Sequence, residues 1–274
     1  MPADIDAAVI ANTRLSDEYS VLALAAPEIA ALAQPGQFVM VKTARGADPL
    51  LRRPFSIFEI LRDGNGAPAG ITLLNKRIGV GTRLLYEAEP GAHIACLGPL
   101  GRPFDPIDPP DQAWMIAGGV GLAPFATLAE ALAARRTPAT LFYGARRAAD
   151  LFYVDFFERL GVKVVLTTED GSRGSKGLVT APLADALGRL DAVARVRLYV
   201  CGPTPMMRAV AHLAESHSRP CEVSLEQVMG CGLGGCYSCV VLAREPGGAP
   251  HFVRSCIQGP VFDSRRIVWD ALAH

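Results

Sequence analysis

The chain has 274 residues, 50% of them hydrophobic and 20% charged, so it is long enough for about two domains with sizeable cores. Lysine plus arginine equals aspartate plus glutamate, at 27 each, which excludes the basic surface that attracts nucleic acid or anionic membranes. Apolar runs are shorter than the about twenty residues of a spanning helix, and no signal-peptide pattern opens the chain. We expect a cytoplasmic protein without nucleic acid or a membrane span.

Residues 1–103 show the pattern of short strands separated by turns. Turn-forming residues at Gln34–Gly36 and Asp63–Gly66 bound apolar segments of β character. Many short strands with regular turns favour a small antiparallel β-barrel. The predicted strands are Val21–Leu24, Gln37–Lys42, Phe55–Ile60 and Ile71–Leu74.

Two segments of this predicted barrel have the chemistry of a phosphate and flavin site. Arg53 carries a planar guanidinium that can bond two phosphate oxygens at once, and the nearby Ser56 hydroxyl can meet the polar edge of a flavin. Gly79–Thr82 is a glycine-rich turn before a helical stretch, and the start of a helix suits a pyrophosphate. Taken alone, a surface arginine and a turn serine explain the first segment equally well.

The pattern changes after Gly98–Gly101, which marks a break. Residues 104–218 alternate short apolar strands with helical stretches, which predicts a parallel sheet with crossover helices, the doubly wound α/β class. The predicted strands are Trp114–Ala117, Thr140–Tyr143, Val162–Thr167 and Arg197–Val200, and the predicted helices are Phe125–Ala134, Leu151–Leu160 and Met206–Glu215.

Turns rich in glycine and proline follow two of these strands. Doubly wound sheets bind ligands at the carboxyl ends of their strands, so two such loops facing one crevice predict a nicotinamide nucleotide. The first turn departs from the G-x-G-x-x-G fingerprint and is by itself a weak signal. The residues concerned are Gly118, Gly119 and Gly121 in the first turn and Cys201, Gly202 and Pro203 in the second.

The choice between NAD and NADP depends on the segment after the second predicted strand. Arg146 and Arg147 lie where NADP sites place a cation for the 2′-phosphate. Asp150 follows closely, and we predict NAD.

Four cysteines near the C-terminus form the most specific pattern. Cys231, Cys236 and Cys239 make a C-x4-C-x2-C run and Cys256 follows, which is the plant-type spacing for a [2Fe–2S] cluster. A zinc ribbon usually has two C-x2-C pairs, and only one is present. Disulfides fit poorly with seven cysteines and no secretory signal. Residues 219–274 form a segment short for an independent core, so we expect the cluster to staple it.

These motifs, taken in order, resemble the electron transfer subunits of bacterial dihydroorotate dehydrogenase, within the wider ferredoxin reductase family. The resemblance covers nearly the whole chain. Its members are Pro35–Phe38, Asp48–Ser56, Gly81-Thr82, Gly98–Gly101, Gly118–Gly121, Gly174–Gly177, Cys201–Pro203, Ser224–Glu226, the four cysteines and Gly259–Phe262.

The resemblance implies FAD between an N-terminal barrel (1–103) and an NAD-binding domain (104–218), with the cluster in a C-terminal segment (219–274). Asn75 stands where the family often has an aromatic residue, and Ala117 replaces the first glycine of its Gly-Gly-Gly start. The family's flavin contacts fall on Arg53, Pro54, Phe55 and Ser56, on Leu74, Asn75 and Lys76, and on Gly81 and Thr82; its cluster ligands fall on Cys231, Cys236, Cys239 and Cys256.

The implied function is electron transfer between NAD(H), FAD and the cluster, to or from the FMN of a catalytic subunit that interconverts dihydroorotate and orotate in pyrimidine biosynthesis. The expected assembly is a heterotetramer with two of each subunit. No catalytic acid, base or nucleophile is required of this chain. Two alternatives stay open: a related reductase subunit that serves ferredoxin, a hydrogenase or another flavoprotein, and a redox sensor that passes no electrons on.

Overall fold

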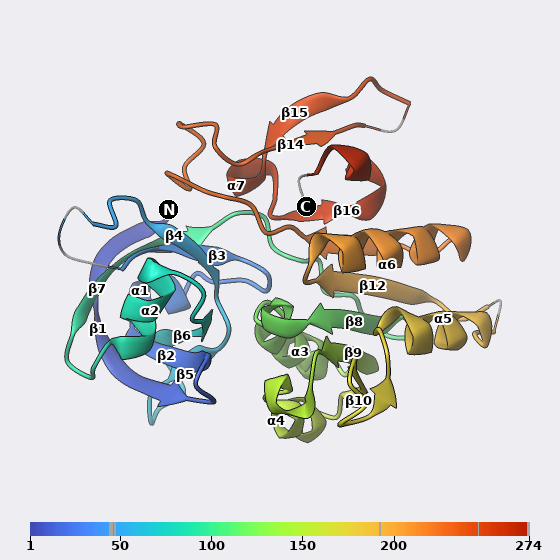
Figure 1. The fold of residues 1–274 in the computed structure, drawn as a ribbon, viewed down its shortest axis with the longest axis horizontal. Helices are drawn as coiled ribbons and strands as arrows, with labels where there is room; N and C mark the ends of the chain where they lie inside the picture. The colour runs from blue at the N-terminus through green and yellow to red at the C-terminus, as the bar shows by residue number, and fades with distance from the viewer. Residues whose placement is uncertain (44–45, 47, 192, 246, 273–274) are drawn as a thin grey trace.

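The computed structural model describes residues 1–272 except 44–45, 47, 192 and 246. Two seven-stranded sheets stand side by side, and a smaller C-terminal part lies across the top of both in Figure 1. The final residues of the predicted C-terminal segment, 273–274, lie outside the described residues. No helix in the described part of the chain is long and apolar enough to cross a membrane.

The first sheet is antiparallel, with strand order β4-β3-β7-β1-β2-β6-β5, and it curls so that β4 lies against β6. This is the predicted barrel, and α2 covers one of its openings beside β6 (Figure 1). Its strands are β1 (Ala3–Arg14), β2 (Tyr19–Ala25), β3 (Phe38–Lys42), β4 (Arg53–Ser56), β5 (Ile60–Arg62), β6 (Pro68–Lys76) and β7 (His93–Leu100), with helices α1 (Pro27–Ala30) and α2 (Val80–Glu87).

The second sheet has the order β11-β10-β9-β8-β12-β13-β16 and is parallel except for β16. This is the predicted doubly wound sheet, and β8 and β12 point their carboxyl ends toward the barrel in Figure 1. The strands are β8 (Gln112–Gly118), β9 (Ala139–Ala145), β10 (Lys163–Thr168), β11 (Ser175–Lys176), β12 (Val196–Cys201), β13 (Cys221–Ser224) and β16 (Val261–Asp263). The helices are η1 (Gly119–Leu122), α3 (Phe125–Ala134), η2 (Ala148–Asp150), α4 (Val154–Arg159), α5 (Thr180–Gly188) and α6 (Thr204–Ser216).

The C-terminal part is tied to both sheets. Its β13 and β16 extend the second sheet, while Arg102 after the barrel donates its N–H to the Gly259 carbonyl at 2.6 Å. Gly101 is left-handed, and a Cβ there would lie 2.5 Å from Pro260. The motif Gly98–Gly101 therefore packs on the motif Gly259–Phe262. Its other elements are the hairpin β14 (Val240–Ala243) and β15 (His251–Arg254), α7 (Ser255–Gln258), η3 (Ser264–Arg266) and η4 (Trp269–Ala271).

Local details differ from the sequence expectation. The predicted strand Phe55–Ile60 is divided, because β4 ends at Ser56 and β5 begins at Ile60. The predicted helix Leu151–Leu160 begins only at Val154, since Tyr153 is left-handed with φ 59° and its ring packs edge-on against Phe58 of the barrel at 4.6 Å.

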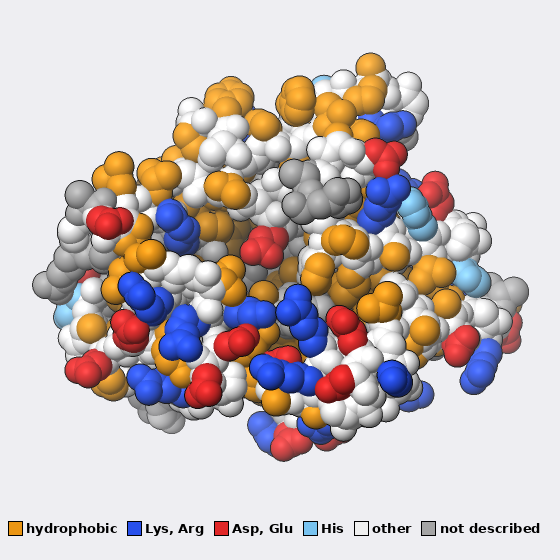
Figure 2. All heavy atoms as spheres, in the orientation of Figure 1, with side chains coloured by type: hydrophobic (Ala, Val, Ile, Leu, Met, Phe, Trp, Pro, Cys, Tyr) orange, Lys and Arg blue, Asp and Glu red, His pale blue; other side chains and the backbone are white. Residues whose placement is uncertain are grey.

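Acidic and basic side chains are mixed over the face shown in Figure 2, with no extended region of one sign. This agrees with the equal totals of acidic and basic residues.

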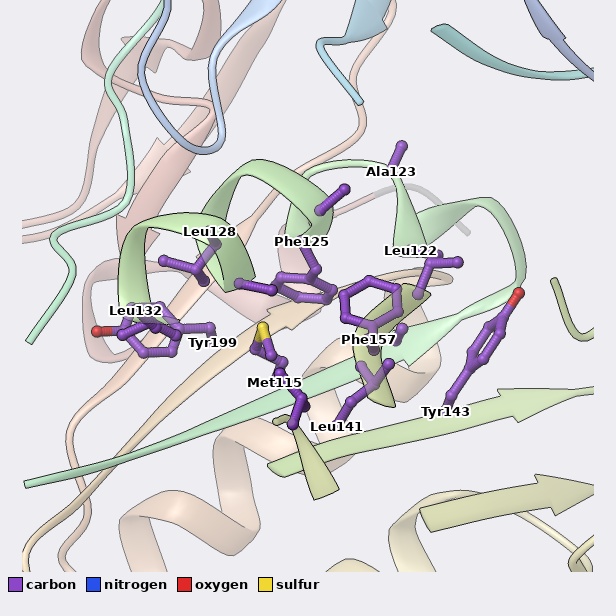
Figure 3. Packing of buried hydrophobic residues seen from close by; sticks show 14 of the residues in the cluster. Met115, Leu122, Ala123, Phe125, Leu128, Leu132, Leu141, Tyr143, Phe157 and Tyr199 are labelled. Atoms are coloured by element: carbon purple, nitrogen blue, oxygen red, sulfur yellow. The ribbon is translucent and has the colours of Figure 1, made fainter. Parts of the chain in front are cut away.

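One hydrophobic core joins the barrel to the second sheet. Leu74 of β6 belongs to the same buried cluster as Leu122 of η1 and Phe157 of α4, and Figure 3 shows Phe125, Leu141 and Phe157 converging over the sheet. The barrel and the nucleotide sheet therefore share buried apolar surface, which holds the two sheets against each other.

Phe157→Ala should lower the free energy of unfolding by about 3–5 kcal/mol, because it leaves a cavity in this shared core. The matched control is Phe252→Ala, at a phenylalanine that is 72% exposed, which should change stability by less than about 0.5 kcal/mol. Urea denaturation of both variants measures the difference. Equal losses would contradict the assigned core.

Candidate functional site

The three predicted flavin segments lie together at one end of the barrel. β4, which is Arg53–Ser56, packs against β6, and β6 packs against α2. The Asn75 side chain is buried and donates from Nδ2 to the Thr82 carbonyl at 3.0 Å. Asn75 therefore ties the second segment to the third, a structural use of the position where the family often has an aromatic ring.

Two neighbouring arginines at the start of β4, Arg52 before it and Arg53 in it, have different partners. Arg52 pairs with Asp4 at 2.8 Å, which anchors the start of β4 to β1. Arg53 is exposed, and its Nη1 donates to the carbonyls of Leu51 and Arg52. Among the described residues no carboxylate pairs with Arg53, so its charge is available to a phosphate group.

Thr43 is a residue of this site that the sequence reasoning missed. Its side chain is nine-tenths buried, and Oγ1 has no hydrogen-bond partner among the described residues. A Cβ on Gly81 would lie 3.2 Å from this oxygen, so the hydroxyl stands beside the first turn of α2. Thr43 therefore packs against the start of α2, the helix end that suits a pyrophosphate. The signal in the sequence was only that Thr43 directly follows a buried strand.

The residues of the predicted flavin motif differ in burial. Leu74 is buried in the shared core, and Phe55 packs against the core of the barrel. Pro54, Ser56 and Lys76 are half-buried. The assignment of these residues to flavin stays a prediction.

The two predicted nucleotide loops touch. β8 and β12 are neighbours, with Ala117 opposite Cys201, and a Cβ on Gly121 would lie 2.2 Å from the Cys201 carbonyl oxygen. Gly119 is left-handed, with φ 56°, and a Cβ there would meet no atom within 4 Å. A tight turn with open space above it suits the close approach of a dinucleotide.

Gly118, Gly202 and Pro203 complete this junction. A Cβ on Gly118 would lie 2.9 Å from Pro203, and one on Gly202 would lie 3.0 Å from the Gly118 nitrogen. Ala117 is fully buried in the shared core, so its methyl group packs inward. Burial raises the pKa of the Cys201 thiol to about 12, which keeps it protonated at neutral pH.

The arginines after β9 are partly neutralised. Arg147 Nε donates to Asp150 at 3.1 Å, so this cation is already paired with a carboxylate. That pairing agrees with a preference for NAD over NADP.

The four cysteines of the predicted cluster lie in the loop between β13 and β14 and in α7. Within the described residues, no three His, Cys, Asp or Glu side chains are arranged about a single metal ion. The thiols instead lie as two neighbouring pairs, Cys231 beside Cys236 and Cys239 beside Cys256. Two pairs suit a [2Fe–2S] cluster, in which each iron takes two cysteines.

The two pairs have different surroundings. Cys236 is exposed, and hydrogen bonds from the Ser238 hydroxyl and N–H lower its pKa to about 6. Burial, followed by the neighbouring Cys239, raises the pKa of Cys256 to about 12. Because thiolates are the ligands, filling the site must release the proton of Cys256.

The inner pair packs directly on the barrel. Cys239 and Cys256 share a buried cluster with Phe38 and Met40 of β3. Phe38 is paired with Ser56 of β4. One strand of the barrel therefore stands between the predicted cluster ligands and the predicted flavin motif.

Comparisons with known proteins assign the chain to a family. Residues 115–212 match the oxidoreductase NAD-binding domain, and residues 226–268 match the iron–sulfur cluster binding domain of dihydroorotate dehydrogenase B. The dihydroorotate dehydrogenase B (NAD(+)) electron transfer subunit of Desulforamulus reducens is 38% identical over 97% of this chain and 98% of its own. The chain belongs to this family of electron transfer subunits. The corresponding subunit of Geobacillus kaustophilus is 36% identical over 94% and 96%.

Solved structures agree with this membership. The NADH-dependent reduced ferredoxin–NADP oxidoreductase superposes with a TM-score of 0.82 at 27% identity, covering 98% of this chain and 92% of that one. The ferredoxin reductase of carbazole 1,9a-dioxygenase gives 0.68 at 24% identity over 80% and 67%, which shows the shared fold. The predicted ferredoxin reductase-like architecture is confirmed, and the chain is an oxidoreductase subunit. The words "electron transfer subunit" imply a separate catalytic subunit.

Gly121→Ala should separate the two nucleotide loops, because its Cβ would overlap the Cys201 carbonyl. We expect a loss of about 1–3 kcal/mol of stability from overpacking and weaker NADH binding. Gly188→Ala is the control, since Gly188 ends α5 and a Cβ there meets nothing within 4 Å; it should be neutral or slightly stabilising. Urea denaturation and NADH titration measure both effects, and a neutral Gly121→Ala would contradict the loop contact.

Proposed function

We propose that this chain passes electrons between NAD(H), FAD and a [2Fe–2S] cluster, to or from the FMN of a dihydroorotate dehydrogenase catalytic subunit. A [2Fe–2S] cluster takes one electron at a time, whereas bound flavin accepts a hydride and releases electrons singly. The observation that carries the proposal is the order of contacts between the predicted sites: η1 of the nucleotide loops contacts β6, β4 contacts both β6 and β3, and the cysteines pack on β3. The residues bind, orient and shield these groups and supply no acid or base.

The residue roles follow from this order. Arg53 binds the flavin phosphates, with the N-terminus of α2 at Gly81 and Thr82 as the second anchor. Gly118, Gly119 and Gly121 admit the dinucleotide backbone, and Cys201–Pro203 lines the end toward the barrel. Cys231, Cys236, Cys239 and Cys256 hold the cluster. The domain limits 1–103, 104–218 and 219–274 describe these three tasks, although β13 and β16 of the last segment complete the second sheet.

The surface around the cysteine loop supports a catalytic subunit as the partner. Leu233, Tyr237 and Ile257 are exposed apolar residues beside the cluster ligands, and Figure 2 shows hydrophobic side chains over the upper part of the molecule. Such side chains mark an interaction surface. We infer that an FMN-containing subunit covers them, in a heterotetramer with two of each subunit, inside the cytoplasm.

A second function has one specific observation in its favour. The NADH-dependent reduced ferredoxin–NADP oxidoreductase matches nearly the whole chain in structure, which supports a reductase that serves ferredoxin. The higher identity to the dihydroorotate dehydrogenase subunits, 38% against 27%, favours the first function. Purification from the native host with identification of the bound partner separates them: a dihydroorotate-oxidising flavoprotein supports the first, and a ferredoxin or another oxidoreductase supports the second.

Arg53→Ala should lower FAD affinity roughly tenfold or more, because a charge-assisted bond to phosphate is lost. Arg62→Ala is the control, since Arg62 lies on β5 and bonds only the Gly66 carbonyl among the described residues. Fluorescence titration of cofactor-free protein with FAD measures both affinities. An unchanged affinity in Arg53→Ala would count against the assigned flavin site.

Cys236→Ser should remove the cluster absorbance while NADH still reduces the flavin, because hydride transfer precedes the cluster. Cys96→Ala is the control, at a cysteine buried inside the barrel, and it should keep the cluster. Anaerobic absorbance spectra before and after NADH addition decide the matter. Failure of flavin reduction in Cys236→Ser would show that the order of carriers is wrong.

Steady NADH oxidation with an artificial electron acceptor tests the reductase activity itself. Cofactor-loaded wild-type protein without turnover would exclude that activity.

A further inference from the structure

Ser238 lies two residues after one cluster cysteine and directly before another, and its hydroxyl has two neighbours. The Gly230 N–H donates to Ser238 Oγ at 2.8 Å. The same oxygen lies 3.2 Å from Cys236 Sγ. The hydroxyl thus joins the backbone at the start of the loop to a ligand sulfur.

The direction of the second bond follows from the first. The Gly230 N–H already points at a lone pair of Ser238 Oγ, so the oxygen acts as the acceptor there. Its own proton is then free to point at Cys236 Sγ, and a thiolate sulfur is a pure acceptor. In the loaded protein the hydroxyl is therefore the donor to the sulfur.

Gly230 leaves the room for this arrangement. A Cβ on Gly230 would lie 3.2 Å from Cys236 Sγ and 3.4 Å from Ser238 Oγ. A side chain would therefore crowd both partners of the hydrogen bond. A second donor acts nearby, since the Leu233 N–H points at Cys231 Sγ at 3.4 Å. Cys231 Sγ and Cys236 Sγ therefore both receive hydrogen bonds from the loop.

We propose that Ser238 raises the reduction potential of the cluster by donating a hydrogen bond to Cys236 Sγ. This rests on the proposed function, because it requires the cluster to be held by these cysteines. Reduction adds one electron and makes the ligand sulfurs more negative, so a donor to sulfur stabilises the reduced form more than the oxidised form. The hydroxyl keeps its proton throughout, and only the electron moves. Ser238 is a positioning residue that makes the cluster a better electron acceptor.

The test compares Ser238→Ala with Ser238→Thr in the complete, cofactor-loaded protein. Electron paramagnetic resonance during a redox titration gives the midpoint potential of the cluster, and absorbance gives that of the flavin. Ser238→Ala should lower the ratio of reduced to oxidised cluster at a fixed potential by up to about tenfold, which is ~59 mV for one electron. Ser238→Thr keeps the hydroxyl and should keep the wild-type value. The flavin midpoint should stay unchanged in both variants.

Equal cluster midpoints in wild type and Ser238→Ala would overturn the proposal, as would an equal fall in Ser238→Thr. If Ser238→Ala loses its cluster, Ser238→Val and Ser238→Thr form the second pair, since they differ chiefly by the hydroxyl. A lower midpoint in Ser238→Val supports tuning. Equal cluster midpoints in Ser238→Val and Ser238→Thr would overturn the proposal. Cluster loss in Ser238→Val as well would also overturn it, and would show that the hydroxyl holds the loop instead. A wild-type protein that shows no two-iron signal after reduction refutes the cluster assignment, a result distinct from all of these.

Discussion

The packing of the cysteine loop onto β3 is the contact on which the arrangement of sites depends. Gly232 is left-handed, and a Cβ there would lie 2.4 Å from Met40 of β3, so the loop backbone sits directly on the barrel. Cys239 and Cys256 are buried by the same strand. The strand next to β3 in the sheet is β4, whose Ser56 is paired with Phe38. This contact sets how far an electron must travel between the flavin motif and the cluster ligands.

The contact between the two nucleotide loops obeys a similar constraint. The nucleotide loops can lie side by side only because Gly121 lacks a side chain above the Cys201 carbonyl. Leu122 and Leu74 then share the core that joins η1 to β6. Close contacts at glycines hold both junctions, and the three parts of the chain therefore pack together as one unit. The C-terminal part adds two strands to the second sheet and a loop to the barrel, which explains how so short a segment can be ordered.

Much of the fold and of the candidate site could be predicted from the sequence, and both the correct and the missed predictions have physical causes. The cluster spacing and the alternation of strands and helices are local patterns, and both sheets were predicted from them. The strands β1 and β7 were not predicted, because they contain alanine, aspartate, glycine and proline, which have low β propensity. Thr43 was missed because its orphaned hydroxyl becomes evident only when β3 meets α2. The pairing of Arg147 with Asp150 is a local contact between residues three apart in the chain, and both residues were singled out from the sequence.

The central claim is that electrons pass from the nucleotide to the flavin and then to the cluster. Anaerobic mixing of loaded protein with NADH, followed by rapid freezing at successive times, measures it directly through flavin absorbance and the paramagnetic signal of the cluster. The structure predicts that flavin bleaching comes first and that the cluster signal grows afterwards. A cluster signal that rises without flavin reduction, or that never appears while the flavin stays reduced, would contradict the account.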